Sequence, residues 1–161
     1  MLDPPRSDTG AWAGLAVWLL LVYGAAAIGG QFTPGAWYDA LDKPPWTPPG
    51  WIFGPVWILL YGMMAAAAWV VWKEDGVRGA RLPLAFFLGQ LALNAAWSWL
   101  FFGLQRPDLA LVDIVLLVAA VAVTLVLFGK RSALAGWLLA PYLLWVSFAT
   151  ALNLEIWRLN L

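Results

Sequence analysis

Five long apolar segments make up most of this chain, and they restrict it to one class of fold. Of its 161 residues, 63% are hydrophobic and 11% are charged, whereas a soluble domain carries about 25% charged residues. A run of about 20 apolar residues is enough to cross the hydrocarbon core of a bilayer as a helix. We therefore expect an all-α integral membrane protein, built as a bundle of five transmembrane helices. The expected spans are residues 11–32, 51–72, 82–103, 107–129 and 133–158.

Residues 11–161 are expected to form a single transmembrane domain, with residues 1–10 as a flexible tail in front of it. The tail is polar and lacks the basic start and small-residue cleavage site of a signal peptide. Five spans put the two termini on opposite sides of the membrane, and more Lys and Arg residues fall on the N-terminal side. The positive-inside rule then predicts a cytoplasmic N-terminus. We expect the inner membrane, because all-helical proteins normally reside there, with the outer membrane as the alternative.

The chain contains no cysteine and no histidine, and their absence excludes several kinds of chemistry. Disulfides, thiolate nucleophiles, Ser-His-Asp catalysis and most zinc or copper sites need one of these residues. The usual protein ligands of haem iron are missing too. Lys and Arg together number 9, as do Asp and Glu, so no net charge favours a nucleic acid. We expect no metal site, no obligatory cofactor and no nucleic-acid partner.

The loop between the first two spans, residues 33–50, is the main polar interruption of the chain. Two proline pairs lie within it, and proline prevents a continuous helix because it fixes φ and has no backbone N–H. We expect this loop to fold over the mouth of the bundle as an aromatic, proline-rich lid. The alternative is an interfacial belt of aromatic rings, which would anchor the protein without binding anything. The rings concerned are Trp37, Tyr38 and Trp46.

The third span has two contrasting faces. At about 100° per residue, one face holds Gln90, Asn94, Trp97 and Phe101. The amides on this face need polar partners or must face a cavity. Gln90 and Asn94 therefore either form hydrogen bonds between helices or line a binding site. Small residues on roughly the opposite face would let another helix backbone approach closely. These residues are Ala85, Gly89, Ala92 and Ala96.

Two other spans also carry aromatic faces, and a third carries a carboxylate. Phe53, Trp57 and Tyr61 share one face of the second span because they follow one another at intervals of four residues. A carboxylate inside the membrane, Asp113 of the fourth span, is a functional candidate by default. Its alternative role is structural, since it lies near a helix N-terminus where negative charge is favoured. One face of the fifth span holds Tyr142, Trp145, Ala149 and Asn153.

Three stretches of the sequence resemble the TspO/MBR family, the tryptophan-rich sensory proteins. They are WYDALDKPPWTPP at residues 37–49, QLALNAAWS at residues 90–98 and PYLLWVSFATALN at residues 141–153. The resemblance covers nearly the whole chain. It implies five transmembrane helices in a homodimer that forms through the small-residue face of the third span. It also implies a pocket under the first loop that takes porphyrins and drug-like hydrophobic molecules of the isoquinoline or benzodiazepine type.

The faces described above and the resemblance together predict the ligand contacts. Trp57 and Trp145 stand at positions that bacterial relatives link to light-dependent porphyrin breakdown, so these two would be catalytic if that reaction occurs. The sterol-recognition pattern of the family is incomplete here, because Leu154 replaces the Tyr that precedes the basic residue Arg158; specific sterol binding is therefore not carried over. The predicted ligand contacts are Trp37, Tyr38, Trp46, Phe53, Trp57, Gln90, Asn94, Trp97, Tyr142, Trp145, Ala149 and Asn153.

We expect a membrane receptor or sensor that binds porphyrins, such as protoporphyrin IX and haem-type tetrapyrroles, and that regulates tetrapyrrole handling or transport. A porphyrin is a flat π-system that can stack on indole rings, and its propionates accept hydrogen bonds from indole and amide N–H groups. Porphyrin would be a ligand and not a resident cofactor. The alternatives are a light-dependent porphyrin-degrading enzyme and a passive membrane scaffold whose aromatic residues form only a belt and a core.

Overall fold

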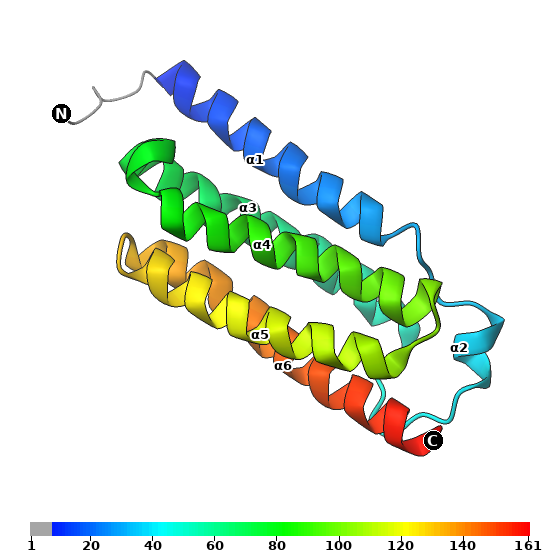
Figure 1. Ribbon diagram of the computed structural model, residues 1–161. Coiled ribbons are helices and arrows are strands. Elements are labelled where there is room, and N and C mark those ends of the chain that lie inside the picture. The colour runs from blue at the N-terminus through cyan, green and yellow to red at the C-terminus, as the bar shows by residue number, and fades with distance from the viewer. Residues whose placement is uncertain (1–7) are drawn as a thin grey trace.

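A computed structural model describes residues 8–161 of the chain, and it is a bundle of roughly parallel and antiparallel helices (Figure 1). Within these residues there is no strand, and five helices are long and apolar enough to cross a membrane. The predicted all-α fold is confirmed, and the chain is a multi-pass integral membrane protein. The elements are α1 (Asp8–Gly29), α2 (Ala36–Ala40), α3 (Gly50–Gly79), α4 (Arg81–Ser98), the π-helical turn η1 (Trp99–Gly103), α5 (Pro107–Gly129) and α6 (Ala133–Leu159).

The helices extend beyond the apolar segments at two places. Helix α1 begins at Asp8, three residues before the predicted start of the first span, while residues 1–7 of the expected tail lie outside the described part. Helix α3 is longer than the span predicted over residues 51–72, since it continues to Gly79. Its last charged turns need no apolar side chains, because they lie past the hydrocarbon. A break at Gly76 interrupts it, with φ at 65° and ψ at 178°, a backbone conformation that suits glycine.

Small residues allow the helices to pack closely. Helix α1 packs against α3 and α4, α5 packs against α4 and α6, and α3 also packs against α6. Where α5 meets α6, a Cβ added to Gly136 would lie 2.9 Å from the Cα of Gly129. The two backbones are therefore in direct contact at this crossing, as is common between transmembrane helices. The larger core side chains include Phe87, which stacks on Phe128 with ring centroids 5.6 Å apart.

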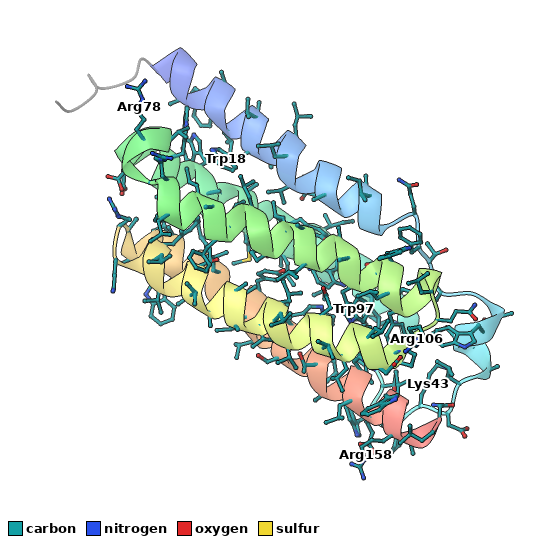
Figure 2. The ribbon with its side chains drawn as sticks, viewed as in Figure 1. Trp18, Lys43, Arg78, Trp97, Arg106 and Arg158 are labelled. Carbon is teal, nitrogen blue, oxygen red and sulfur yellow. The ribbon has the colours of Figure 1, made fainter. Side chains whose placement is uncertain are left out.

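The outer surface of the bundle is apolar, whereas charged side chains gather at its two ends. Leu20 and Leu144 are more than 70% exposed and belong to a large set of exposed apolar side chains, as is typical of a surface that faces a membrane. At one end of the bundle Arg78 is labelled in Figure 2, and Lys43, Arg106 and Arg158 are labelled at the other end, near α2 and the C-terminus. This distribution is the one expected for a chain that spans a bilayer.

The small-residue face of α4 points away from the bundle. Ala85, Gly89 and Ala92 are exposed, and Ala96 is half-buried. A Cβ added to Gly89 would meet no described atom within 4 Å. The face is therefore open to another helix backbone, and pairing of two copies through it stays a prediction.

Candidate functional site

The loop of residues 33–50 folds across one end of the bundle as a lid (Figure 1). Two of its rings point inward from α2 onto the phenylalanines of η1. Trp37 packs edge-on against Phe101 at a centroid distance of 5.8 Å, and Tyr38 packs edge-on against Phe102 at 5.5 Å. Trp46 lies farther out and is 47% exposed. The aromatic residues of the lid are therefore divided between inward packing and a position at the surface.

Beneath the lid lies a cavity of about 640 Å³. Pockets for small ligands have volumes of about 300–1,000 Å³ and walls that are mostly apolar, so this cavity has the size of a binding site. Its walls come from the lid, from η1 and from every long helix. The aromatic and polar residues among its lining are Phe32, Thr33, Tyr38, Asp39, Lys43, Thr47, Phe53, Trp57, Tyr61, Asn94, Trp97, Ser98, Phe101, Phe102, Trp145 and Asn153.

Eight of the twelve predicted ligand contacts line this cavity, and four do not. Trp37 and Trp46 pack outside its lining, against Phe101 and Phe148. Gln90 and Tyr142 are buried behind the wall, each at most 1% exposed. The eight lining residues are Tyr38, Phe53, Trp57, Asn94, Trp97, Trp145, Ala149 and Asn153.

A chain of hydrogen bonds runs behind the wall from α3 to α4 and α6. The Tyr61 hydroxyl donates to Asn94 Oδ1 at 2.6 Å, and Asn94 Nδ2 donates to the Tyr142 hydroxyl at 3.0 Å. The Tyr142 hydroxyl donates in turn to Gln90 Oε1 at 2.8 Å, and Gln90 Nε2 lies 3.7 Å from Met64 Sδ. For Gln90 the structure thus supports the interhelical alternative. For Asn94 both alternatives hold: its side chain forms hydrogen bonds between helices, and it also lines the cavity.

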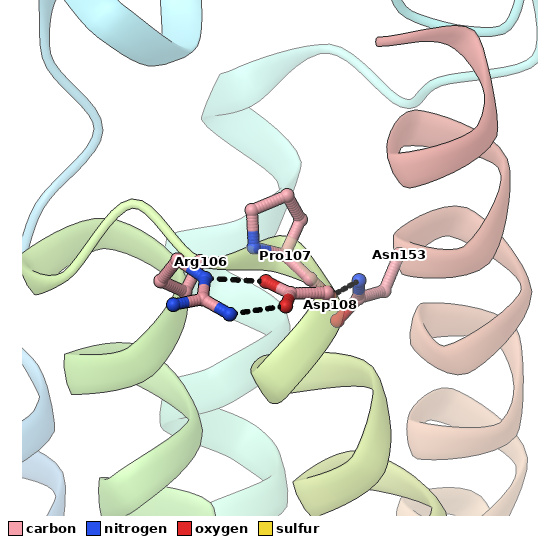
Figure 3. A network of polar contacts seen from close by, with 4 residues as sticks. All are labelled: Arg106, Pro107, Asp108 and Asn153. Atoms are coloured by element: carbon pink, nitrogen blue, oxygen red, sulfur yellow. Dashed lines mark hydrogen bonds and ion pairs between the residues drawn. The ribbon is translucent and has the colours of Figure 1, made fainter. Parts of the chain in front are cut away.

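Asn153 joins three helices at the lid end of the cavity. The Trp97 indole N–H donates to Asn153 Oδ1 at 2.9 Å, and Asn153 Nδ2 donates to the Pro107 carbonyl at 2.9 Å. Figure 3 shows Asn153 of α6 reaching the start of α5, beside the ion pair of Arg106 and Asp108. This arrangement fixes the Trp97 ring, which stacks on Phe101 at 5.0 Å. The wall at this corner is therefore tied by hydrogen bonds to α4, α5 and α6.

Trp57 and Trp145 line the cavity from α3 and α6. Trp57 stacks on Tyr61 with centroids 5.3 Å apart and an interplanar angle of 29°. Trp145 packs edge-on against Phe53 at 5.6 Å. Its indole Nε1 is buried and has no hydrogen-bond partner among the described residues. Because this N–H is buried, a ligand could accept a hydrogen bond from it only after neighbouring side chains move.

Charge is sparse around the cavity. Lys43 and Asp39 of the lid line its mouth. The pKa of the Tyr38 hydroxyl is raised above its usual value by burial and, to a smaller extent, by the Asp39 carboxylate, so Tyr38 stays neutral at physiological pH. Asp113 does not line the cavity; it is 8% exposed, and its buried Oδ2 has no hydrogen-bond partner within residues 8–161.

The predicted contacts leave out several lining residues, among them Tyr61 and Lys43. For Tyr61 a signal exists, because it continues the face of Phe53 and Trp57 at the same four-residue spacing. For Lys43 the sequence offers no such signal. A lysine that follows an acidic residue and precedes a proline pair is expected to be solvent-exposed. Lys43 reaches the cavity only because the lid folds back over the bundle.

Comparison with known proteins gives consistent matches over most of the chain. The model of the TspO/MBR family matches residues 16–158. The translocator protein of Homo sapiens is 46% identical over 138 residues, which cover 83% of this chain and 82% of the human protein. The tryptophan-rich protein TspO of Chlorobaculum tepidum is 44% identical over 153 residues, covering 91% of this chain and 94% of that protein. The tryptophan-rich sensory protein of Cereibacter sphaeroides is 40% identical over 149 residues, covering 92% of each chain.

Proposed function

Because this chain belongs to the TspO/MBR family, we propose that it is a membrane receptor or sensor that binds porphyrins and other flat hydrophobic molecules in the cavity beneath its lid. One observation carries the proposal. Indole, phenol and phenyl rings from the lid, α3, α4, η1 and α6 converge on a single mostly apolar cavity of about 640 Å³. Aromatic rings favour stacked or edge-on contact with a flat π-system, and here they surround the space from several sides.

The hydrogen bonds of the site limit how a ligand can be held. The amides of Asn94 and Asn153 already pair with protein groups. Donors for a porphyrin propionate should therefore come from the lid, since Lys43 lines the cavity. The chain has no histidine or cysteine to bind a central metal. Stacking and burial of the ring should then supply most of the affinity. The role that we propose for this binding is the regulation of tetrapyrrole handling or transport.

A titration in the dark tests this proposal. Protein purified in detergent is mixed with protoporphyrin IX, and quenching of tryptophan fluorescence is followed to saturation. In the variant Ala149→Phe a larger side chain enters the cavity, and affinity should fall about tenfold or more. The matched control is Ala151→Phe, since Ala151 is exposed on the same helix and does not line the cavity. Unsaturable quenching, or equal loss in both variants, would contradict the proposal and leave the scaffold alternative.

A second candidate function is light-dependent breakdown of the bound porphyrin. The observation that favours it is that Trp57 and Trp145 line the same cavity, so one bound ring could contact both indoles. Replacing both by Phe keeps aromatic stacking but removes the indoles. If porphyrin still binds and its bleaching under illumination stops, the enzymatic alternative gains. If bleaching continues unchanged, these indoles do not carry the reaction.

The assembly and orientation are part of the same proposal. Two copies would pair through the exposed small-residue face of α4, which lets two backbones approach closely. The basic residues at the end opposite the lid support a cytoplasmic N-terminus and a lid on the far side of the inner membrane. Those in the described part are Lys73, Arg78, Arg81, Lys130 and Arg131.

A further inference from the structure

We propose that Lys43 selects for anionic ligands, its ammonium group binding a carboxylate of the molecule that occupies the cavity. The inference rests on the proposed function, because it assigns a charge to the ligand of that same site. It names the preferred ligand more narrowly: a flat hydrophobic molecule that carries at least one carboxylate at its edge should bind more tightly than a neutral molecule of the same shape.

Lys43 differs from the other basic side chains at the lid end of the described chain. Arg106 forms an ion pair with Asp108, and Arg158 forms one with Glu155 at 3.2 Å. No ion pair found within residues 8–161 includes Lys43. Yet Lys43 is half-buried and lines the cavity. The site thus keeps a cation without a carboxylate partner at the mouth of an apolar space.

The structure holds this ammonium group in place without neutralising it. Lys43 Nζ donates to the Leu41 carbonyl at 3.0 Å and to the Asp39 carbonyl at 3.3 Å, and it lies 4.6 Å from the centre of the Tyr38 ring. An ammonium group has three N–H donors, so one remains after these two bonds. Carbonyls and a ring face carry only partial negative charge. A carboxylate could therefore take the third donor and complete a charge-assisted hydrogen bond.

An acidic residue that also lines the cavity should weaken this interaction. Asp39 also lines the mouth of the cavity, and its exposed carboxylate repels an anion. Removing that charge with Asp39→Asn should tighten binding of an anionic ligand, whereas removing the charge of Lys43 should loosen it. The two changes have opposite signs, although the two residues are neighbours in the same lid.

The competing explanation is that Lys43 only caps the carbonyls at the end of α2 and stabilises the lid. A capping role would affect all ligands alike, whatever their charge. The test therefore compares protoporphyrin IX with its dimethyl ester, which has the same ring and no carboxylates. Both are titrated in the dark against wild-type protein, Lys43→Gln, Lys43→Arg and Asp39→Asn. The control is Arg158→Gln, since Arg158 lies at the same end but in a surface ion pair.

Wild-type protein should bind the dicarboxylate more tightly than the ester. Lys43→Gln should weaken binding of the dicarboxylate by about tenfold and leave the ester nearly unchanged, while Lys43→Arg restores most of the loss. Equal weakening of both ligands by Lys43→Gln would overturn the inference in favour of a capping role, as would equal affinity of wild-type protein for both. Failure of wild-type protein to bind either ligand saturably would overturn the proposed function itself.

Discussion

The side-chain amide of Asn160 pairs with both backbone polar groups of Asp42. The Asp42 N–H donates to Asn160 Oδ1 at 3.0 Å, and Asn160 Nδ2 donates to the Asp42 carbonyl at 2.9 Å. Asn160 follows the last residue of α6, and its Nδ2 also donates to the Ile156 carbonyl at 2.7 Å. One residue therefore closes the end of α6 and fastens the lid to it.

Replacing Asn160 by Ala should release the lid without unfolding the bundle. Both hydrogen bonds to Asp42 are lost, while the packing of the five long helices is untouched. We expect faster dissociation of a bound porphyrin in stopped-flow experiments and faster hydrogen exchange at the Asp42 amide. Asn160→Asp should have a smaller effect, because it retains the acceptor for the Asp42 N–H. Unchanged exchange at Asp42 in the Ala variant would show that other contacts hold the lid.

Replacing Tyr142 by Phe should destabilise the bundle. The hydroxyl receives a hydrogen bond from Asn94 and gives one to Gln90, and without it two buried amide groups lose partners. A buried polar group left unpaired costs about 1–3 kcal/mol. Thermal unfolding in detergent should show a lower Tm. The control is Tyr23→Phe, whose exposed hydroxyl donates to the Ile58 carbonyl, and a fall in Tm of similar size there would argue against this explanation.

Replacing Gly136 by Ala should force α5 and α6 apart. The new Cβ would lie 2.9 Å from the Gly129 Cα, closer than real contacts allow, and overpacking of this kind costs about 1–3 kcal/mol. A lower Tm is expected. In contrast, Gly24→Ala adds a methyl group on α1 where no described atom lies within 4 Å. Because Ala favours a helix over Gly, that control should keep or raise the Tm.

Large side chains on the small-residue face of α4 should prevent pairing of two copies. Gly89→Leu together with Ala92→Leu would keep the backbones apart, but neither position lines the cavity. Light scattering of the protein in detergent should report a monomer, and porphyrin titration should be unaffected. The control is Val115→Leu, which is exposed on α5. A dimer that persists in the double variant would place the interface elsewhere.

Metal-free protoporphyrin should bind about as tightly as haem. Without histidine or cysteine, axial ligation would fall to poor ligands. Tyr61 and Tyr142 donate to amide oxygens, and the sulfur of Met64 faces Gln90. Burial raises the pKa of the Tyr38 hydroxyl, which disfavours the phenolate that would bind iron. Paired titrations with the two rings measure this. Much tighter binding of haem, with an absorption shift typical of an axial ligand, would show that a side chain binds the iron and would contradict this prediction.

The sequence by itself determined the parts of this protein that depend on local pattern. Uninterrupted apolar runs require helices in a bilayer, because every backbone N–H and C=O must be paired within the segment. Proline pairs at residues 44–45 and 48–49 end the helical pattern and so locate the lid. Helical periodicity placed Asn94 and Trp97 on one face of α4, and both line the cavity.

The tertiary structure decided what depends on the relative placement of elements. Periodicity gives the angle of a side chain around its own helix, but it does not give the rotation of that helix against its neighbours. Gln90 therefore lies behind the wall, tied to Tyr142, although its face was correctly assigned. Likewise, Asp42 and Asn160 are separated by 118 positions, and no local signal predicts that they pair. Lys43 reaches the cavity for the same physical reason, since closing the lid over the bundle is a long-range event.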